Sequence, residues 1–243
     1  MPADNPTIVA TSMGFVATGR DRFDLAAGPV FDLCADLSGA AGTPKVCYLG
    51  TATGDEKTAI ASVYSALSPK FSASHLELFS MPNVEDVRAH LLEQDVVWVG
   101  GGSVANLLAL WRLHGWDEHL RAAWQAGVVL AGVSAGSLCW HLGGTTDSFG
   151  PTLQPVTDGL GFLPYSNGVH YDKETQRRPL YHRLIADGML PDGYATDDGV
   201  GLVYAGTELV EAVSDRNDCF AYSVTRDNAG KAVETVIEPR RLT

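Results

Sequence analysis

A serine flanked by two glycines stands where a strand-like run meets a helix-like run. Residues 132–136 read GVSAG, after the apolar run GVVLA and before SLCWHL. Glycines on either side of a serine permit a sharp turn that lifts its hydroxyl above the sheet, which is typical of a nucleophile elbow. A helix beginning just after the turn would direct backbone N–H groups and its positive dipole end at the attacked group. The pattern predicts covalent acyl transfer at Ser134.

A second glycine cluster fits the same chemistry. Residues 100–103 read GGGS and follow the apolar run VVWV. Backbone N–H groups with no side chains in front of them can bind a developing oxyanion, so these glycines are candidates for an oxyanion hole. No lysine follows them, which excludes a phosphate-binding P-loop. Each glycine run could instead be a plain strand-to-helix turn, and a motif as short as GVSAG also arises by chance.

A serine nucleophile needs a neighbouring base, and His170 is the best placed of the seven histidines. It follows the turn-like run SNGV, so it falls at a strand end or in a loop, where active-site groups concentrate. For the acid, Asp197 and Asp198 stand before a glycine, between two apolar strand-like runs. A carboxylate there could hold the histidine N–H and stabilise the imidazolium that forms. Three further aspartates are rivals that a turn or cap role explains better, namely Asp147, Asp158 and Asp172.

Strand-like and helix-like runs alternate along the first part of the chain. We expect strands at 7–11, 45–49, 75–79, 96–99 and 128–133, and helices at 24–37, 56–67, 84–92, 104–113 and 117–125. Continuous apolar strands between helices predict a doubly wound, mostly parallel α/β sheet with ligands at the carboxyl ends of its strands. The runs 207–213, 219–224 and 232–237 predict antiparallel edge strands near the C-terminus. No linker or repeat interrupts the pattern, so we expect one domain over residues 1–243.

Composition excludes several function classes. The 243 residues carry 29 acidic against 17 basic side chains, a net charge of −12, which argues against nucleic acid and anionic membranes as partners. The N-terminal residues lack a signal-peptide pattern and no apolar run reaches spanning length, so we expect a cytoplasmic protein. The four cysteines form no C-x-x-C pair and lie in or near apolar runs, which predicts buried free thiols rather than a zinc site.

Taken in order, the runs GGG, GVSAG, GVHY and DDG resemble the peptidase E family, which includes aspartyl dipeptidase and cyanophycinase. The resemblance covers roughly residues 45 to 213. It implies a flavodoxin-like or glutamine-amidotransferase-like α/β fold, with Ser134 as nucleophile and His170 as general base. It further implies oxyanion donors in the backbone N–H groups of Gly101 or Gly102 and of Ala135, and no metal or organic cofactor.

The third member of the triad departs from the family pattern. Aspartyl dipeptidase has a glutamate before the glycine, whereas Asp198 stands at the matching position here. An aspartate is one methylene shorter, so the backbone must approach the histidine more closely. Asp198 is therefore the expected acid, with Asp197 and Asp147 left open.

Four of the 17 basic residues lie within eleven positions after the candidate base: Lys173, Arg177, Arg178 and Arg183. Pro179 suits the first position of a helix, which predicts Arg178 at the helix cap, where an anion is favoured. The resemblance matches Arg178 to the arginine that binds an acidic P1 side chain. We therefore expect a serine exopeptidase that removes N-terminal aspartate from short acidic peptides.

Several alternatives stay open at this point. A cyanophycinase-like or isoaspartyl peptidase would share the same residues, and a catalytically silent module could share the fold. An α/β-hydrolase esterase is disfavoured because its acid usually precedes its histidine. A glutamine amidotransferase would need a cysteine where Ser134 stands. The oligomeric state also stays open, with a homodimer as one possibility, and so does the presence of a lid.

Overall fold

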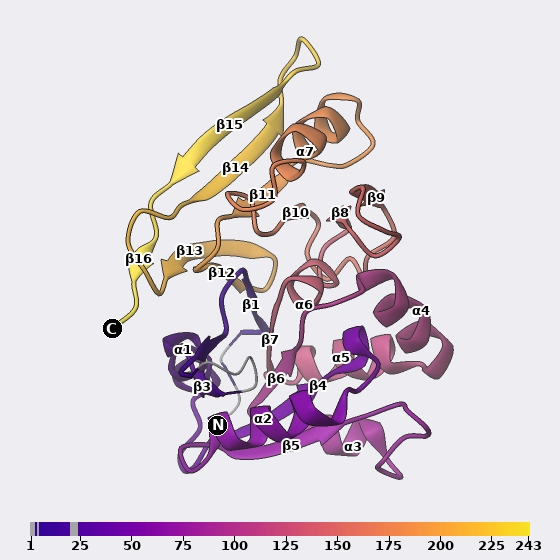
Figure 1. Cartoon of the computed structure of the whole chain (residues 1–243), viewed down its shortest axis with the longest axis vertical. Helices are drawn as coiled ribbons and strands as arrows, with labels where there is room; N and C mark the ends of the chain where they lie inside the picture. Colours follow the sequence, from indigo (N-terminus) through magenta and orange to yellow (C-terminus); the bar gives the residue numbers. More distant parts are fainter. Residues whose placement is uncertain (1–2, 4, 20–23) are drawn as a thin grey trace.

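The computed structural model describes residues 3, 5–19 and 24–243, and two stacked sheets organise them (Figure 1). The larger sheet has eight strands in the order β16 (Arg240–Arg241), β13 (Glu208–Ser214), β12 (Val200–Ala205), β1 (Thr7–Thr11), β7 (Val129–Val133), β6 (Val96–Val99), β4 (Lys45–Leu49) and β5 (Ser72–Leu76). From β1 to β5 all neighbours are parallel. On the other side of β1, strands β12 and β13 are antiparallel, as predicted for this region.

Helices cover both faces of this sheet, which explains its continuous apolar strands. They are α1 (Pro29–Ser38), α2 (Lys57–Leu67), α3 (Val87–Leu92), α4 (Val104–His114), α5 (Trp116–Gln125) and the single turn α6 (Ala135–Leu138), besides a short 3-10 turn at Thr51–Thr53. Val46 and Tyr48 of β4 pack with α1 and α2, whereas Cys47 and Leu49 pack with α4 and α5 on the opposite face. Alternate side chains are thus buried on opposite sides, and the predicted doubly wound architecture is confirmed.

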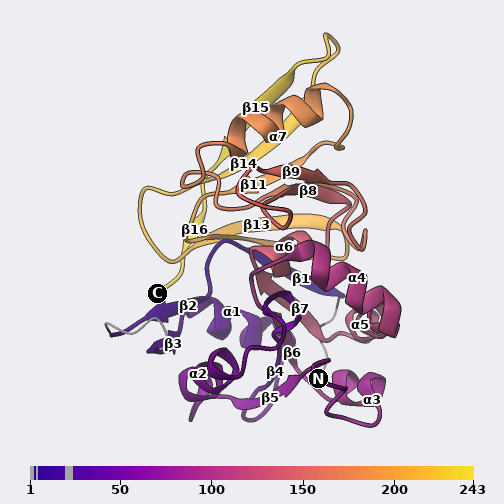
Figure 2. The same ribbon diagram turned by 45° about the vertical axis from the view of Figure 1, so that its right-hand side comes forward.

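The second sheet was not foreseen as a separate layer. Its six strands run in the order β15 (Ala232–Ile237), β14 (Ala221–Arg226), β11 (Gly193–Thr196), β10 (Ser166–Gly168), β8 (Gly143–Thr146) and β9 (Gln154–Val156). The strands expected at 219–224 and 232–237 form here as β14 and β15, not at the edge of the main sheet. Tyr222 and Val224 pack with Leu180 and Leu184 of α7 (Arg177–Ala186), which gives this sheet a hydrophobic core of its own. Figure 2 shows it as a distinct layer beyond β13.

Two element boundaries differ from expectation for identifiable reasons. The helix expected from 24 begins only at Pro29, because Leu25–Ala27 is strand β3, paired in a hairpin with β2 (Phe15–Ala17). The strand expected at 75–79 lies earlier, at Ser72–Leu76, where it is in register with β4. It ends there because the Asp55 carboxylate accepts the N–H groups of Leu78 and Phe79.

Two composition-based expectations meet the structure directly. All four cysteines are buried and free, as predicted. Within the described ranges, the structure contains no helix long and apolar enough to cross a bilayer.

Candidate active site

The predicted elbow is a strained turn at the carboxyl end of β7. Ser134 has φ 59° and ψ −113°, a left-handed conformation that typically costs a non-glycine residue roughly 1–3 kcal/mol. Its N–H donates to Thr11 O at 3.1 Å. A Cβ on Gly136 would lie 2.2 Å from Val99 O, so a glycine is required by close approach there. The helix after the turn is shorter than expected, since it ends at Leu138 instead of continuing to residue 142.

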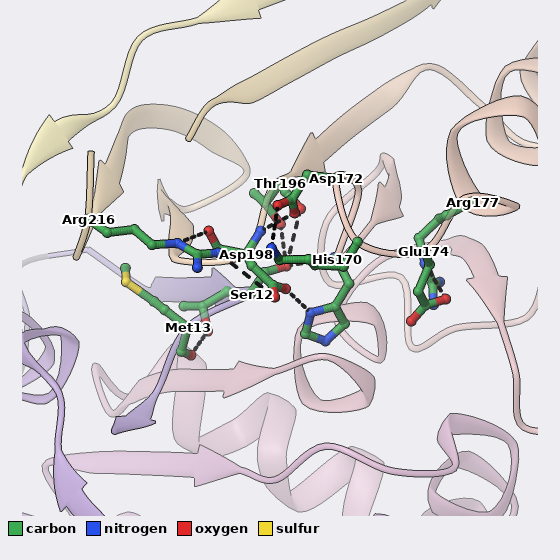
Figure 3. A network of polar contacts seen from close by, with 11 residues as sticks. Ser12, Met13, His170, Asp172, Glu174, Arg177, Thr196, Asp198 and Arg216 are labelled. Atoms are coloured by element: carbon green, nitrogen blue, oxygen red, sulfur yellow. Dashed lines mark hydrogen bonds and ion pairs between the residues drawn. The ribbon is translucent and has the colours of Figure 1, made fainter. Parts of the chain in front are cut away.

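His170 follows β10 by two residues, at a strand end as expected, and pairs with Asp198 in the turn between β11 and β12. Its Nδ1 is hydrogen-bonded to Asp198 Oδ1 (Figure 3). A carboxylate accepts from Nδ1–H, which leaves Nε2 as the nitrogen that can take a proton. In Figure 3 that second nitrogen points away from Asp198.

The other candidate acids are occupied elsewhere. Asp197 is buried, and its Oδ2 accepts from Phe220 N at 3.0 Å and from Tyr222 OH at 3.1 Å. Burial raises the pKa of its carboxyl group. Asp147 is exposed in the turn before β9. The geometry therefore brings His170 together with Asp198, not with Asp197 or Asp147.

The glycine loop after β6 lies directly against the nucleophile. A Cβ built on Gly101 would be 3.2 Å from Ser134 Cβ and 3.7 Å from Ser134 Oγ. Gly102 has φ 132°, and a Cβ there would lie 2.5 Å from Ala52 O. Gly102 is required by this close approach and by its positive φ, whereas a Cβ on Gly101 would crowd Ser134, so bare backbone flanks the hydroxyl on the side of β6. Bare backbone beside the serine hydroxyl is where an oxyanion hole would lie.

The model of peptidase family S51 matches residues 24–212. The chain belongs to peptidase family S51. It is 45% identical over 182 residues to the uncharacterized peptidase YgaJ of Bacillus subtilis, covering 74% of this chain and 78% of that protein. It is 29% identical over 143 residues to a peptidase E of Shewanella denitrificans, covering 55% of this chain and 60% of that protein.

Solved structures of low sequence identity share the fold. A peptidase from an acI-B1 Actinobacterium superposes with a TM-score of 0.66 at 16% identity, over 96% of this chain and 95% of that one. A putative peptidase E from Listeria monocytogenes gives a TM-score of 0.57 at 17% identity, over 86% of this chain and 98% of that one. Family membership makes the chain a serine-type peptidase and agrees with the resemblance found in the sequence.

Two consecutive residues of this S51 peptidase, at the end of β1, hold the candidate triad. Thr11 O accepts the N–H of Ser134. The neighbouring Ser12 Oγ accepts the N–H of His170 at 3.0 Å (Figure 3). Ser12 O also accepts the N–H of Gly199, the residue after Asp198. Ser12 is buried, and its hydroxyl lies 2.8 Å from Thr196 Oγ1. The sequence gives little indication of this role, since its signal is limited to the polar pair Thr11-Ser12 after the apolar residues IVA.

Arg178 is placed differently from the prediction. Helix α7 of the S51 peptidase begins at Arg177, so Arg178 is its second residue and not its cap. Pro179 is tolerated there because N–H groups throughout the first turn lack intrahelical partners. The guanidinium is hydrogen-bonded to Glu234 of β15, with Nε 3.0 Å from Oε2, and its centre lies 5.0 Å from the Tyr171 ring.

The basic cluster around Arg178 is thus not one surface. Arg177 is buried and bonds to Glu174 and Thr145, which ties α7 to β8. Arg178 is partly exposed, and Lys173 and Arg183 are exposed. Arg178 therefore stays the member of the cluster that combines a fixed position with access from solvent.

Proposed function

We propose that this peptidase is a serine exopeptidase that hydrolyses short peptides with an N-terminal aspartate. Ser134 Oγ attacks the carbonyl carbon of the first residue while His170 Nε2 takes the hydroxyl proton. Asp198 stabilises the imidazolium, and the backbone N–H groups of Gly101 or Gly102 and of Ala135 bind the oxyanion. The C–N bond then breaks as His170 gives its proton to the leaving amine, and water hydrolyses the acyl ester with His170 again as base.

The observation that carries this proposal is the pairing of His170 with Asp198 beside a strained serine elbow. Thr11 and Ser12 tie the nucleophile and the base to adjacent residues of one strand end. Strained backbone that the surroundings hold in place is typical of active sites. A binding module without activity would have no use for an oriented imidazole at this position.

The preference for aspartate is assigned to Arg178. Its guanidinium stacks on Tyr171, the residue directly after the base, and the side chain is 43% exposed. A substrate carboxylate would share or replace Glu234 as its partner, and a planar guanidinium binds a carboxylate through two parallel hydrogen bonds.

The first test is a panel of X-Leu dipeptides with Asp, Glu, Asn, isoaspartate or Ala as the first residue. We expect hydrolysis of Asp-Leu, lost by at least about a thousandfold in Ser134→Ala because the nucleophile is gone. Ser65→Ala, an exposed serine of α2, is the matched control and should retain full activity. Turnover confined to isoAsp-Leu would replace the proposal with an isoaspartyl peptidase. No turnover would favour a polymeric substrate or a silent module.

The specificity assignment is tested by Arg178→Ala. We expect kcat/KM for Asp-Leu to fall roughly ten- to a hundredfold relative to Ala-Leu, since a charge-assisted hydrogen bond is lost. Arg183→Ala, exposed on the same helix, should leave the ratio of the two substrates unchanged. An unchanged ratio in Arg178→Ala would assign aspartate recognition to another group.

A further inference from the structure

A cavity of about 610 Å³ opens beside His170 and Asp198, and most of its lining residues have no part in the proposed mechanism. One wall is apolar and includes Met13, Phe15 and Pro29, while Asp215 and Arg216 lie on its polar side. The volume is within the range of small-molecule sites, which combine apolar walls with a few polar groups.

The cavity and the glycine loop after β6, which carries Gly101 and Gly102, flank the elbow on opposite sides. In the sheet, β7 carries Ser134 and lies between β6 and β1. The loop with Gly101 follows β6, whereas Ser12 and Met13, which line the cavity, follow β1. His170 itself borders the cavity.

The reaction chemistry determines which half of the substrate binds on the cavity side of Ser134. During acyl-enzyme formation the leaving amine takes a proton from His170, so it must lie within hydrogen-bond reach of the imidazole. The carbonyl oxygen must face the backbone N–H groups on the other side. The residue that departs therefore lies on the side where His170 borders the cavity.

We propose that this cavity binds the leaving residue of a dipeptide, with Arg216 anchoring its C-terminal carboxylate and the apolar wall contacting its side chain. The inference rests on the proposed exopeptidase function and makes the enzyme selective for a free C-terminus. It also predicts a preference for apolar residues in the second position.

Arg216 is held in place for this role by backbone contact. Its Nε donates to Asp198 O at 2.7 Å, and Nη2 lies 3.8 Å from Asp198 Oδ2 (Figure 3). Within the described residues, Nε is the guanidinium nitrogen of Arg216 that donates a hydrogen bond. An arginine carries five N–H donors in total. The side chain is 44% exposed, so its remaining donors are accessible to a bound carboxylate.

Asp215 is the opposing charge in the same cavity. A Cβ on Gly199 would lie 2.7 Å from Asp215 Oδ1 and 2.5 Å from Arg216 Nε, so the two side chains border the same glycine. An ammonium group would bind at Asp215 and a carboxylate at Arg216. The leaving residue of a dipeptide brings a carboxylate, whereas the ammonium belongs to the acyl half.

The test compares Asp-Leu with its C-terminal amide, in the wild-type enzyme and in Arg216→Ala. We expect kcat/KM to favour the free acid roughly ten- to a hundredfold in the wild type, because a charge-assisted hydrogen bond is made only by the carboxylate. Arg216→Ala should abolish the preference and Arg216→Lys should retain part of it. Both substrates share the acyl half, so their ratio cancels any effect of Arg216 on Asp198. Arg88→Ala, exposed on α3, is the matched control.

A binding measurement separates this inference from the proposed function. Calorimetric titration with leucine and with leucinamide needs no turnover. Preferential binding of leucine, lost in Arg216→Ala and kept in Asp215→Asn, supports the cavity assignment even if no Asp-X dipeptide is hydrolysed. Equal binding of the two ligands, or an acid-to-amide ratio that Arg216→Ala leaves unchanged, overturns it. A preference for leucinamide that Asp215→Asn removes would assign the cavity to the ammonium-bearing half.

Discussion

Ser134 and His170 share an unusual backbone conformation, each being a non-glycine residue with positive φ, at 59° and 51°. Both strained residues are fixed through their N–H groups, one by Thr11 and the other by Ser12. The surrounding fold thus holds both residues in a backbone conformation that is unfavourable for an isolated non-glycine residue.

The assignment of the acid is tested by a pair of neighbouring variants. Asp198→Asn should lower kcat by roughly a thousand- to ten-thousandfold, because an amide cannot stabilise the imidazolium or enforce the tautomer with Nδ1–H. Asp197→Asn should mainly lower the free energy of unfolding, by about 1–3 kcal/mol, since its carboxylate accepts bonds from Phe220 and Tyr222. Activity and urea unfolding of each variant check this, and the opposite pattern would make Asp197 the functional acid.

What the sequence reveals at this scale depends on residue type. Ser134, His170 and Asp198 could be proposed because their side chains carry chemistry and follow recognisable turns. Ser12 could not, because its contact with His170 joins positions 158 apart and exists only through the topology. The partner of Arg178 was hidden for the same reason, since Glu234 lies on a strand whose sheet was not foreseen.

At the scale of elements, glycine-rich turns at the ends of β6 and β7 determine the site. The alternation of strands and helices was predictable because the central strands β1, β4, β6 and β7 are almost entirely buried and therefore read as apolar runs between helical patterns. Boundaries were less predictable where tertiary contacts decide them. Asp55 ends β5 by accepting N–H groups from the residues beyond it, and no local pattern shows that contact.

Two glycine variants separate the chemical role of these turns from their structural role. Gly101→Ala should fold, because its added Cβ stays 3.2 Å or more from every neighbour, but it should crowd Ser134 and lower kcat about tenfold or more. Gly136→Ala should lower the free energy of unfolding by about 1–3 kcal/mol or more, since its Cβ would lie 2.2 Å from Val99 O. Thermal unfolding and Asp-Leu hydrolysis distinguish the two. A destabilised Gly101→Ala with normal kcat would contradict the proximity argument.

At the scale of the whole molecule, an aromatic contact joins the two sheets. Tyr204 of β12 stacks on Tyr165, and its ring centre lies 6.2 Å from that of Tyr194 in β11. His141 packs edge-on against Tyr204 and bonds to Ser137 O through Nδ1. The separate second sheet escaped prediction because β14 and β15 read as generic strands, and only packing against α7 decides which sheet they join.

Because His141 is buried at this contact between the two sheets, we expect the protein to lose stability in acid. Burial lowers the pKa of His141 to about 4 from an ordinary value near 6.5, so the folded state favours the neutral ring. Above pH 6.5 this contribution is complete, and it is lost as the pH falls from about 6.5 to about 4, by roughly 3 kcal/mol in total. Urea unfolding at pH 7, 5.5 and 4 should therefore show a smaller decline in His141→Gln than in the wild type. His114→Gln, exposed at the end of α4, is the control, and parallel declines in all three proteins would refute the assignment.

Three residues that contribute to the surroundings of the triad come from the two ends of the chain. Ser12, Arg216 and Glu234 all lie outside the stretch that the S51 family model matches, while Ser134, His170 and Asp198 lie within it. Arg178, to which we assign the aspartate preference, lies within the matched stretch, whereas Arg216, the proposed anchor of the leaving residue, lies outside it. The family match therefore covers the proposed cleavage machinery and the proposed aspartate site, but it carries no expectation about the residue that follows the scissile bond.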